Sequence, residues 1–169
     1  MLHPLDQAQL PNLHNLDKES FVAPYDKGLK YSVPFTRGHT GIVVNTDEVK
    51  VPAGDVSWSL LLQSPRPQQT ALLDDMREVF AACLFWKGKD PNERNPQVLT
   101  EIGRDLMQVK KSVSMFSSEP VPLLLKSEIH IAHGFTNHAS QTAAQNPAFK
   151  FYFPKEGAIT WTDNLAIPK

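Results

Sequence analysis

The chain has 169 residues, of which 41% are hydrophobic and 21% are charged, so it is expected to fold around a hydrophobic core and not to be disordered. Its formal net charge is −1, which excludes a global positive field that would draw it to nucleic acid or to an anionic membrane surface. The uninterrupted apolar runs are only a few residues long, far below the roughly 20 residues that a membrane-spanning helix needs.

The N-terminal segment predicts peripheral structure. Residues 1–6 have neither the basic leader nor the apolar core of a secretory signal peptide, so none is expected within this chain. Residues 1–35 are rich in Pro, Asn, Asp and His, with irregularly spaced apolar side chains, which indicates loops and a short helix. Residues 42–45 form a β-branched run typical of a buried strand, and the preceding Gly38 and Gly41 permit close approach of other groups.

A short strand and a helix follow a proline-rich connection. Residues 70–73 predict the strand, and Asp74 or Asp75 is expected to cap a helix that runs to about Lys87. Cys83 lies in an apolar stretch of that helix and is expected to be a buried thiol. It is the only cysteine, so it cannot form an internal disulfide.

A second helix is expected to begin at Pro96 with Asn95 as its cap. Apolar residues share one face of this helix: Leu99, Ile102, Leu106, Val109 and Val113. The pattern then predicts a short helix at 122–126, a strand at 128–135, a helix at 137–145, and extended segments at 149–153 and 159–167.

The alternation of strands and helices predicts an α/β fold with a central, mainly parallel sheet flanked by helices. Ligands of such folds bind beyond the carboxyl ends of the strands. That rule nominates three places for a ligand site: residues 74–78, the surroundings of Phe135 and the surroundings of Trp161.

Acidic residues gather at the first of these places. Asp75 followed by Glu78 matches a capping box, in which acidic side chains satisfy free backbone N–H groups at a helix start. The same two carboxylates would also suit an ammonium group of a ligand. The two interpretations are compatible if one carboxylate caps the helix.

Trp161 and Asp163 are two residues apart, so in a strand they point to the same face. An aromatic ring beside a carboxylate suits an organic cation, because the ring attracts the cation by about 0.5–2 kcal/mol. The alternative is a core tryptophan beside a turn aspartate.

A metal site and a cofactor are not expected. His130, His133 and His138 match no zinc-binding spacing and have no accompanying cysteine, and in an alternating strand His130 and His133 face opposite ways. The sequence also contains no phosphate-binding loop, nucleophile elbow or nucleotide fingerprint. An enzyme would therefore depend on carboxylates alone, and no catalytic residue is assigned.

Two segments carry a resemblance to a known family. Residues 72–80, Leu-Leu-Asp-Asp-Met-Arg-Glu-Val-Phe, and residues 154–168, which run from Pro-Lys-Glu-Gly into Trp-Thr-Asp-Asn-Leu-Ala-Ile-Pro, resemble the periplasmic spermidine/putrescine-binding proteins of ABC transporters. Weaker similarity extends through residues 31–35 and 41–45 and covers nearly the whole chain.

The resemblance implies a type II periplasmic binding protein fold, in which two α/β lobes joined by crossing strands close on a ligand. Residues 1–169 would form one such lobe, with 1–30 as a peripheral segment and with 31–45 and 159–168 as strands that cross to a missing second lobe. The chain would be extracytoplasmic, in the periplasm, and would deliver its ligand to the permease subunits of an ABC importer without inserting into the membrane.

The resemblance also assigns residue roles. Asp75, Glu78, Trp161 and Asp163 match positions at which the family holds the amines and methylene chain of a polyamine. Phe135 stands where the family commonly has tryptophan, so it keeps an apolar face with a weaker attraction for cations. Arg37 replaces an aromatic residue of the family and would repel a polyamine if it faces the ligand.

The expected function is therefore the non-enzymatic binding of a polyamine, spermidine or putrescine, or of a related organic cation. One alternative is a binding protein for a different small solute, with Arg37 recognising a carboxylate. Another is a carboxylate-dependent glycoside hydrolase, which would use Asp75 or Glu78 with Trp161 as a platform for a sugar.

Overall fold

The computed structural model describes residues 1–51 and 54–169. The chain divides into two compact units, His39–Thr160 and a second unit formed by Met1–Gly38 together with Trp161–Lys169. The first strand, β1 (Ser32–Asn45), and the last, β6 (Ile159–Ala166), each contribute residues to both units.

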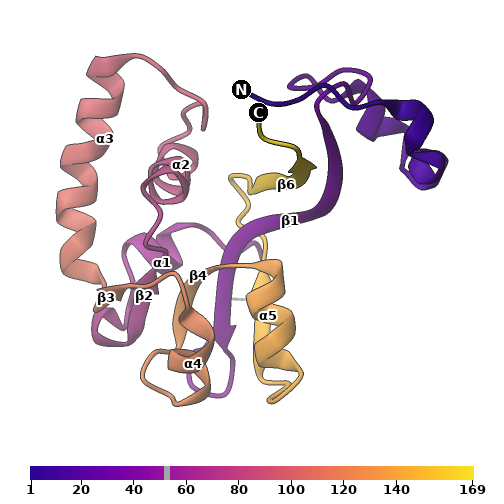
Figure 1. Ribbon diagram of the computed structural model, residues 1–169. Helices are drawn as coiled ribbons and strands as arrows, with labels where there is room; N and C mark the ends of the chain where they lie inside the picture. The colour runs from indigo at the N-terminus through magenta and orange to yellow at the C-terminus, as the bar shows by residue number, and fades with distance from the viewer. Residues whose placement is uncertain (52–53) are drawn as a thin grey trace. The chain divides into compact units, whose positions relative to one another are not determined.

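Unit His39–Thr160 alternates helices and strands along the chain (Figure 1). After β1, its α-helices and strands are α1 (Ser59–Leu62), β2 (Thr70–Leu72), α2 (Met76–Trp86), α3 (Pro96–Val109), β3 (Met115–Phe116), α4 (Pro120–Leu125), β4 (Ile131–Phe135), α5 (Thr136–Ala143) and β5 (Phe149–Tyr152). Short 3-10 helices occupy Pro67–Gln69 and Lys110–Ser112. The α/β class expected from the sequence is confirmed.

The sheet has the strand order β3-β2-β4-β1-β5, and β6 also pairs with β1. β2 is parallel to β3 and to β4, whereas β1 is antiparallel to both β4 and β5. Strands β2, β3, β4 and β5 therefore run in one direction and β1 runs against them. The expected mainly parallel sheet is confirmed, and β1 is the exception because it reaches the sheet without a crossover helix.

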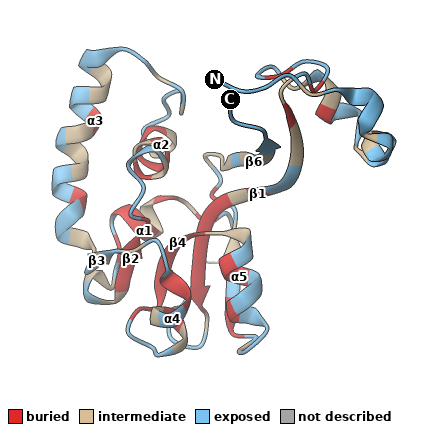
Figure 2. Ribbon diagram, viewed as in Figure 1, coloured by how far each residue is buried: buried red, intermediate tan, exposed pale blue. Residues whose placement is uncertain are grey.

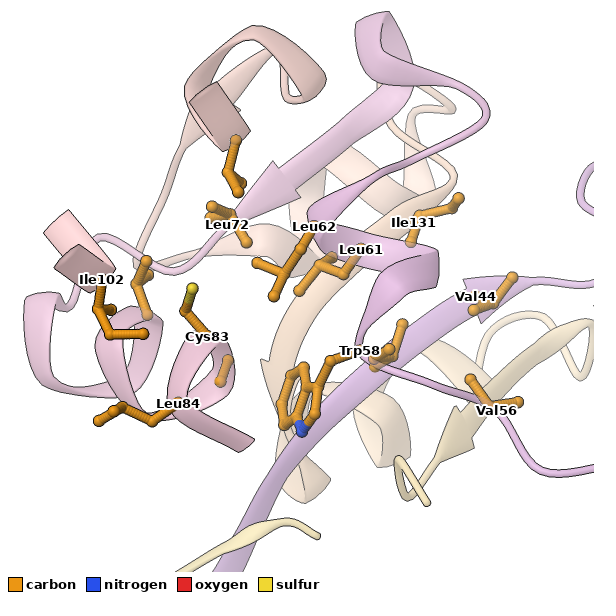
Figure 3. Close-up of a cluster of buried hydrophobic side chains, with 14 of the residues drawn as sticks. Val44, Val56, Trp58, Leu61, Leu62, Leu72, Cys83, Leu84, Ile102 and Ile131 are labelled. Carbon is orange, nitrogen blue, oxygen red and sulfur yellow. The ribbon is translucent and has the colours of Figure 1, made fainter. Parts of the chain in front are cut away.

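Hydrophobic cores lie on both faces of the sheet. On one face, the core joins the sheet to α1, α2 and α3 through residues that include Trp58, Leu62, Leu72, Cys83, Ile102 and Ile131 (Figure 3). On the other face, Val43, Ala71 and Ala132 pack with Leu124 of α4 and Ala139 of α5. β2, most of β4 and the second half of β1 are accordingly buried (Figure 2), as expected for a sheet with helices on both faces.

Cys83 belongs to the first core and is fully buried. Burial raises the pKa of its thiol to about 11, the negative charge of Asp105 acts in the same direction, and the positive charge of Lys87 opposes them. The buried thiol expected from the sequence is confirmed.

The two main helices begin as the sequence predicts. Asp75 precedes α2 in an extended conformation, and Asn95 caps α3 by accepting a hydrogen bond from the Gln97 backbone N–H at 3.0 Å. Pro96 occupies the first position of α3, where a missing N–H costs nothing. Local side-chain chemistry therefore fixes both helix starts.

Three short 3-10 helices, at Gln7–Gln9, Pro11–Asn15 and Lys18–Val22, occupy the N-terminal part of the second unit, where the sequence predicted loops and a short helix. The buried Asp26 carboxylate organises the chain before β1: it accepts hydrogen bonds from the backbone N–H groups of Lys30, Tyr31 and Ser32 at 2.8–3.0 Å. The Ser32 hydroxyl donates a fourth, at 2.9 Å. Although burial alone would raise it, the pKa of Asp26 is lowered because these donors stabilise its charged form.

Candidate functional site

Asp75 is the helix cap of the acidic pair. Its Oδ1 accepts hydrogen bonds from the backbone N–H groups of Arg77 at 2.9 Å and Glu78 at 3.1 Å, and the residue is exposed. Two of the free N–H groups at the start of α2 are thereby satisfied. The capping interpretation is confirmed for Asp75, and a negative charge at this end of the helix is also favourable.

Glu78 lies on the same first turn of α2 but turns its carboxylate inward. Oε2 is buried and has no hydrogen-bond partner among the described residues. Burial raises the pKa of Glu78, and the charge of Asp75 raises it further, whereas the nearby Thr40 hydroxyl and the charge of Arg77 lower it. Of the two carboxylates, only Glu78 is therefore held in a partly desolvated setting.

Phe135 lies at the end of β4 and immediately before α5, with its ring half-buried. Its backbone N–H donates a hydrogen bond to Nδ1 of His138 at 3.3 Å, and the two ring centroids are 5.1 Å apart. Burial lowers the pKa of His138, and the charge of Glu119 opposes this; its ring takes part in the capping box at the start of α5 by accepting from the N-cap backbone. His138 thus has a structural role beside Phe135.

Asp75, Glu78 and Phe135 belong to one compact unit, at the carboxyl ends of β2 and β4. We call these three residues the helix group. Thr40 of β1 connects them, because it pairs with Phe135 across the sheet and its hydroxyl acts on Glu78. The rule that places ligands beyond the carboxyl ends of parallel strands thus applies to this group.

Trp161 and Asp163 lie in β6 and belong to the other unit. We call them the strand group. The indole lies directly against Gly38, since a Cβ atom built on that glycine would be 2.1 Å from Cζ2 of Trp161. Gly38 therefore has a steric role: it lets an aromatic ring lie across the backbone of β1. Trp161 is half-buried and Asp163 is exposed.

Arg37 belongs to the same unit as the strand group, and its Nη1 lies 3.6 Å from Oε2 of Glu19. The two side chains are 50% and 82% exposed, so this ion pair contributes only about 0–1 kcal/mol. The nearby carboxylate nevertheless offsets the positive charge that the sequence raised as an obstacle to a cationic ligand.

Two buried polar residues near the helix group were not predicted as part of a site. Thr40 and His133 are both 0% exposed, and the Thr40 hydroxyl and both His133 ring nitrogens lack hydrogen-bond partners in the described part of the chain. The sequence singled out His133 only as a metal candidate. Its position two residues before Phe135 in an alternating strand was the available signal, because it puts both side chains on one face.

Within residues 1–51 and 54–169, no group of three or more His, Cys, Asp or Glu side chains has a geometry suited to a metal ion. Over the same residues, no helix combines the length and apolarity required to cross a membrane.

The whole chain, residues 1–169, matches the family of bacterial extracellular solute-binding proteins. Among curated relatives, spermidine/putrescine-binding periplasmic protein 1 of Haemophilus influenzae is 34% identical over 171 residues, which cover 99% of this chain and 47% of that protein. The putrescine-binding periplasmic protein PotF of Escherichia coli is 32% identical over 187 residues, covering 99% of this chain and 50% of PotF. The chain thus spans about half the length of these relatives.

Solved structures agree with this similarity. The substrate-binding protein PotD of a spermidine/putrescine ABC transporter from Streptococcus pneumoniae superposes with a TM-score of 0.83 at 27% identity, over 100% of this chain and 52% of PotD. The TpPotD lipoprotein of Treponema pallidum superposes with a TM-score of 0.88, also at 27% identity, over 100% of this chain and 54% of that structure. The fold of the chain is therefore that of about half of such a protein.

Proposed function

The chain belongs to the bacterial extracellular solute-binding proteins, and from that premise we propose that it binds a polyamine, putrescine or spermidine, without catalysing a reaction. Its relatives are named for binding these solutes. We further propose that the chain forms one lobe of such a protein, with β1 and β6 as the strands that cross to a second lobe. In this role it works outside the cytoplasm and delivers the solute to the permease subunits of an ABC importer.

The observation that carries the proposal is the pair of carboxylates at the start of α2, of which Glu78 is partly buried. Among the described residues, neither Asp75 nor Glu78 forms a salt bridge with a basic side chain. A partly buried carboxylate without a cation is unfavourable, as the raised pKa of Glu78 reflects. An ammonium group of the ligand supplies the missing charge and donates hydrogen bonds to the carboxylate oxygens.

The aromatic residues suit the same ligand. Phe135 belongs to the same unit as Asp75 and Glu78, and Trp161 belongs to the same unit as Asp163. An aromatic face attracts an ammonium group or covers a methylene chain. We propose ligand contacts for Asp75, Glu78, Phe135, Trp161 and Asp163. A solute with a carboxylate is the second candidate because of Arg37, but the pairing of Arg37 with Glu19 disfavours it.

Titration of the 169-residue chain with putrescine, followed by the amide signals of an NMR spectrum, tests the proposal. We expect saturable shifts at the amides of Asp75–Glu78 and of Trp161–Asp163, with weak affinity, because exposed charge pairs contribute little. Butane-1,4-diol is the matched control, since it has the same chain length without charge and should leave these signals unchanged. Glutamate tests the alternative solute class in the same way.

Charge-removing variants then assign the residues. Asp163→Asn and Glu78→Gln keep side-chain shape and should each weaken putrescine binding, and we expect the larger loss for Asp163→Asn. Glu101→Gln, an exposed position on α3 outside both groups, should bind as the unmodified chain does. Equal shifts with putrescine and with the diol, or unchanged binding in both site variants, would refute the polyamine assignment.

A further inference from the structure

Three side chains have buried polar atoms without partners among the described residues: Thr40 and His133 in the sheet, and Glu78 on the first turn of α2. Within the described residues, hydrogen-bond partners are missing for Oγ1 of Thr40, for Oε2 of Glu78 and for both ring nitrogens of His133. Thr40 and His133 are 0% exposed. A buried polar atom left unsatisfied costs about 1–3 kcal/mol, so several such atoms in one region call for a common partner.

Sheet register and electrostatics bring the three side chains together. Thr40 pairs with Phe135 and Ile42 pairs with His133, so Thr40 and His133 are diagonal neighbours on one face of the sheet. The Thr40 hydroxyl lies close enough to the Glu78 carboxylate to lower its pKa, and Asp75, on the same turn of α2, raises the pKa of His133. The start of α2 therefore lies over both strands at this point.

Among the residues that the structure describes, the surroundings of His133 provide no hydrogen-bond partner for its ring. The indole of Trp58 meets the imidazole edge to face, with ring centroids 5.3 Å apart, but its Nε1 already donates to the backbone carbonyl of Gly157 at 2.9 Å. Ile42 is apolar and fully buried. Burial lowers the pKa of His133 to about 3, so the ring is neutral and carries one N–H donor and one acceptor nitrogen.

We propose that Thr40, Glu78 and His133 bind a water molecule beneath the first turn of α2, and that His133 acts through this water to position the Glu78 carboxylate. Buried waters typically form about three hydrogen bonds with otherwise unsatisfied polar groups, which matches the three side chains present. His133 is thus a positioning residue and not a ligand contact. The inference rests on the proposed function only for the identity of the cation that Glu78 meets.

This arrangement favours the charged form of Glu78 although the carboxylate is partly buried. A hydrogen bond donated to a carboxylate favours its charged form. The water donates such a bond to Oε2 and is itself held by the imidazole and the hydroxyl. Replacing His133 by leucine changes no charge at neutral pH, because the imidazole is already neutral. Any change in the proton affinity of Glu78 would therefore come from the lost hydrogen bonds.

The test follows the carboxyl carbon of Glu78 by NMR during a pH titration of the 169-residue chain. We expect His133→Leu to raise the pKa of Glu78 by at least one pH unit, and His133→Gln, which keeps a donor and an acceptor, to restore most of the shift. His130→Leu is the matched control, because His130 is another buried histidine just before β4 and should leave Glu78 unchanged. A high-resolution crystal structure of the unmodified chain should contain the water.

An unchanged pKa of Glu78 in a folded His133→Leu variant would overturn the inference. If that variant does not fold, the crystal structure decides, since no water within hydrogen-bond distance of both His133 and Oε2 of Glu78 would also overturn it. A failure of the proposed function looks different: the pKa of Glu78 would respond to His133→Leu while putrescine left the amides of α2 unshifted.

Discussion

The helix group and the strand group combine the same chemical types, an aromatic ring and a carboxylate, on different supports. Glu78 and Phe135 stand above fully buried residues of β1 and β4, and their surroundings shift the pKa of Glu78 and of His133. Asp163 lies exposed on β6, and Trp161 is positioned by the bare backbone at Gly38. The helix group is thus held by buried polar contacts and the strand group by steric fit.

Because the two groups are supported in different ways, we expect different perturbations to affect them. A group supported by buried titratable residues should respond to pH and to the loss of a hydrogen-bonding side chain. A group supported by close packing should respond to the addition of one methyl group. Four measurements exploit this contrast.

The largest expected effect is the acid sensitivity of the unit that holds the helix group. An unfolded histidine has a pKa of 6.5, whereas that of His133 is about 3 in the folded chain. Below pH 6.5 the unfolded chain takes up a proton that the folded chain does not. The contribution of His133 to the free energy of unfolding is therefore complete above pH 6.5 and declines as the pH falls toward 3. From pH 7 to pH 5 the loss is about 2 kcal/mol, measurable by urea unfolding.

His133→Leu is the control for this measurement. Other groups also titrate between pH 7 and pH 5, and Glu78 acts in the opposite direction, because its raised pKa means that the folded chain gains stability as it is protonated. The difference between the two proteins contains the contribution of His133 together with any further rise in the Glu78 pKa, which acts in the same direction and is measured separately by the NMR titration of Glu78. Identical pH dependence of unfolding in both would show that His133 is not buried as a neutral base.

Gly38→Ala should produce the largest effect on the strand group. The new methyl group would overlap the Trp161 ring, so the indole must move, and we expect putrescine affinity to fall about tenfold, or about 1.4 kcal/mol. Gly103→Ala is the matched control, since its Cβ would lie 3.8 Å from the Phe80 ring, within a helix. It should stabilise the fold by about 0.5–1 kcal/mol without changing affinity.

The shift of the Trp161 indole N–H signal shows whether the ring has moved. A Gly38→Ala variant with an unshifted indole signal and unchanged affinity would contradict the steric role of Gly38. A shifted indole with unchanged affinity would instead remove Trp161 from the proposed ligand residues.

Substitutions of Asp75 separate its capping role from its charge. Asp75→Ala removes the acceptor of two backbone N–H groups and should lower the free energy of unfolding by about 1 kcal/mol. Asp75→Asn keeps a good cap and should lie within a few tenths of a kcal/mol of the unmodified chain, apart from the lost interaction with the helix dipole. Urea unfolding measures both, and equal losses in the two variants would argue against capping as the source of stability.

Phe135→Trp should give the smallest effect. The larger ring attracts an ammonium group more strongly, by about 0.5 kcal/mol, so putrescine affinity should rise about twofold. Phe135→Leu keeps an apolar side chain without an aromatic face and should lower it. If all three side chains bind putrescine equally, Phe135 provides packing only.

Much of the fold could be predicted because the signals are local. Asn95 and Pro96 predict the start of α3, and the β-branched run at residues 42–45 predicts the buried part of β1. The sequence missed α1 and β3, which have four and two residues and are too short for a periodic pattern. The local pattern alone predicted a strand only at 42–45, because the glycines at 38 and 41 interrupt it, whereas the family resemblance implied a strand over 31–45 and β1 is continuous over 14 residues.

Within the candidate site, the helix cap was predictable from the sequence, but the buried polar surroundings of Glu78 were not. Asp75 could be predicted as a cap from its spacing to Glu78, because capping involves neighbours in the sequence. The inward-turned Glu78 lies near Thr40, which is distant in sequence and influences the carboxylate only in the folded chain. No local pattern encodes such a contact, so the polar layer beneath α2 became visible only with the tertiary structure.

The buried thiol has a practical consequence. With a pKa of about 11, only about one Cys83 side chain in ten thousand is a thiolate at pH 7, and the thiolate is the species that reacts with alkylating agents and disulfides. As the only cysteine of the chain, it leaves no competing thiol on the surface. A cysteine introduced at an exposed position such as Glu101 would therefore be the single site for a fluorescent dye, so that ligand-induced motion can be followed without first replacing Cys83 in the core.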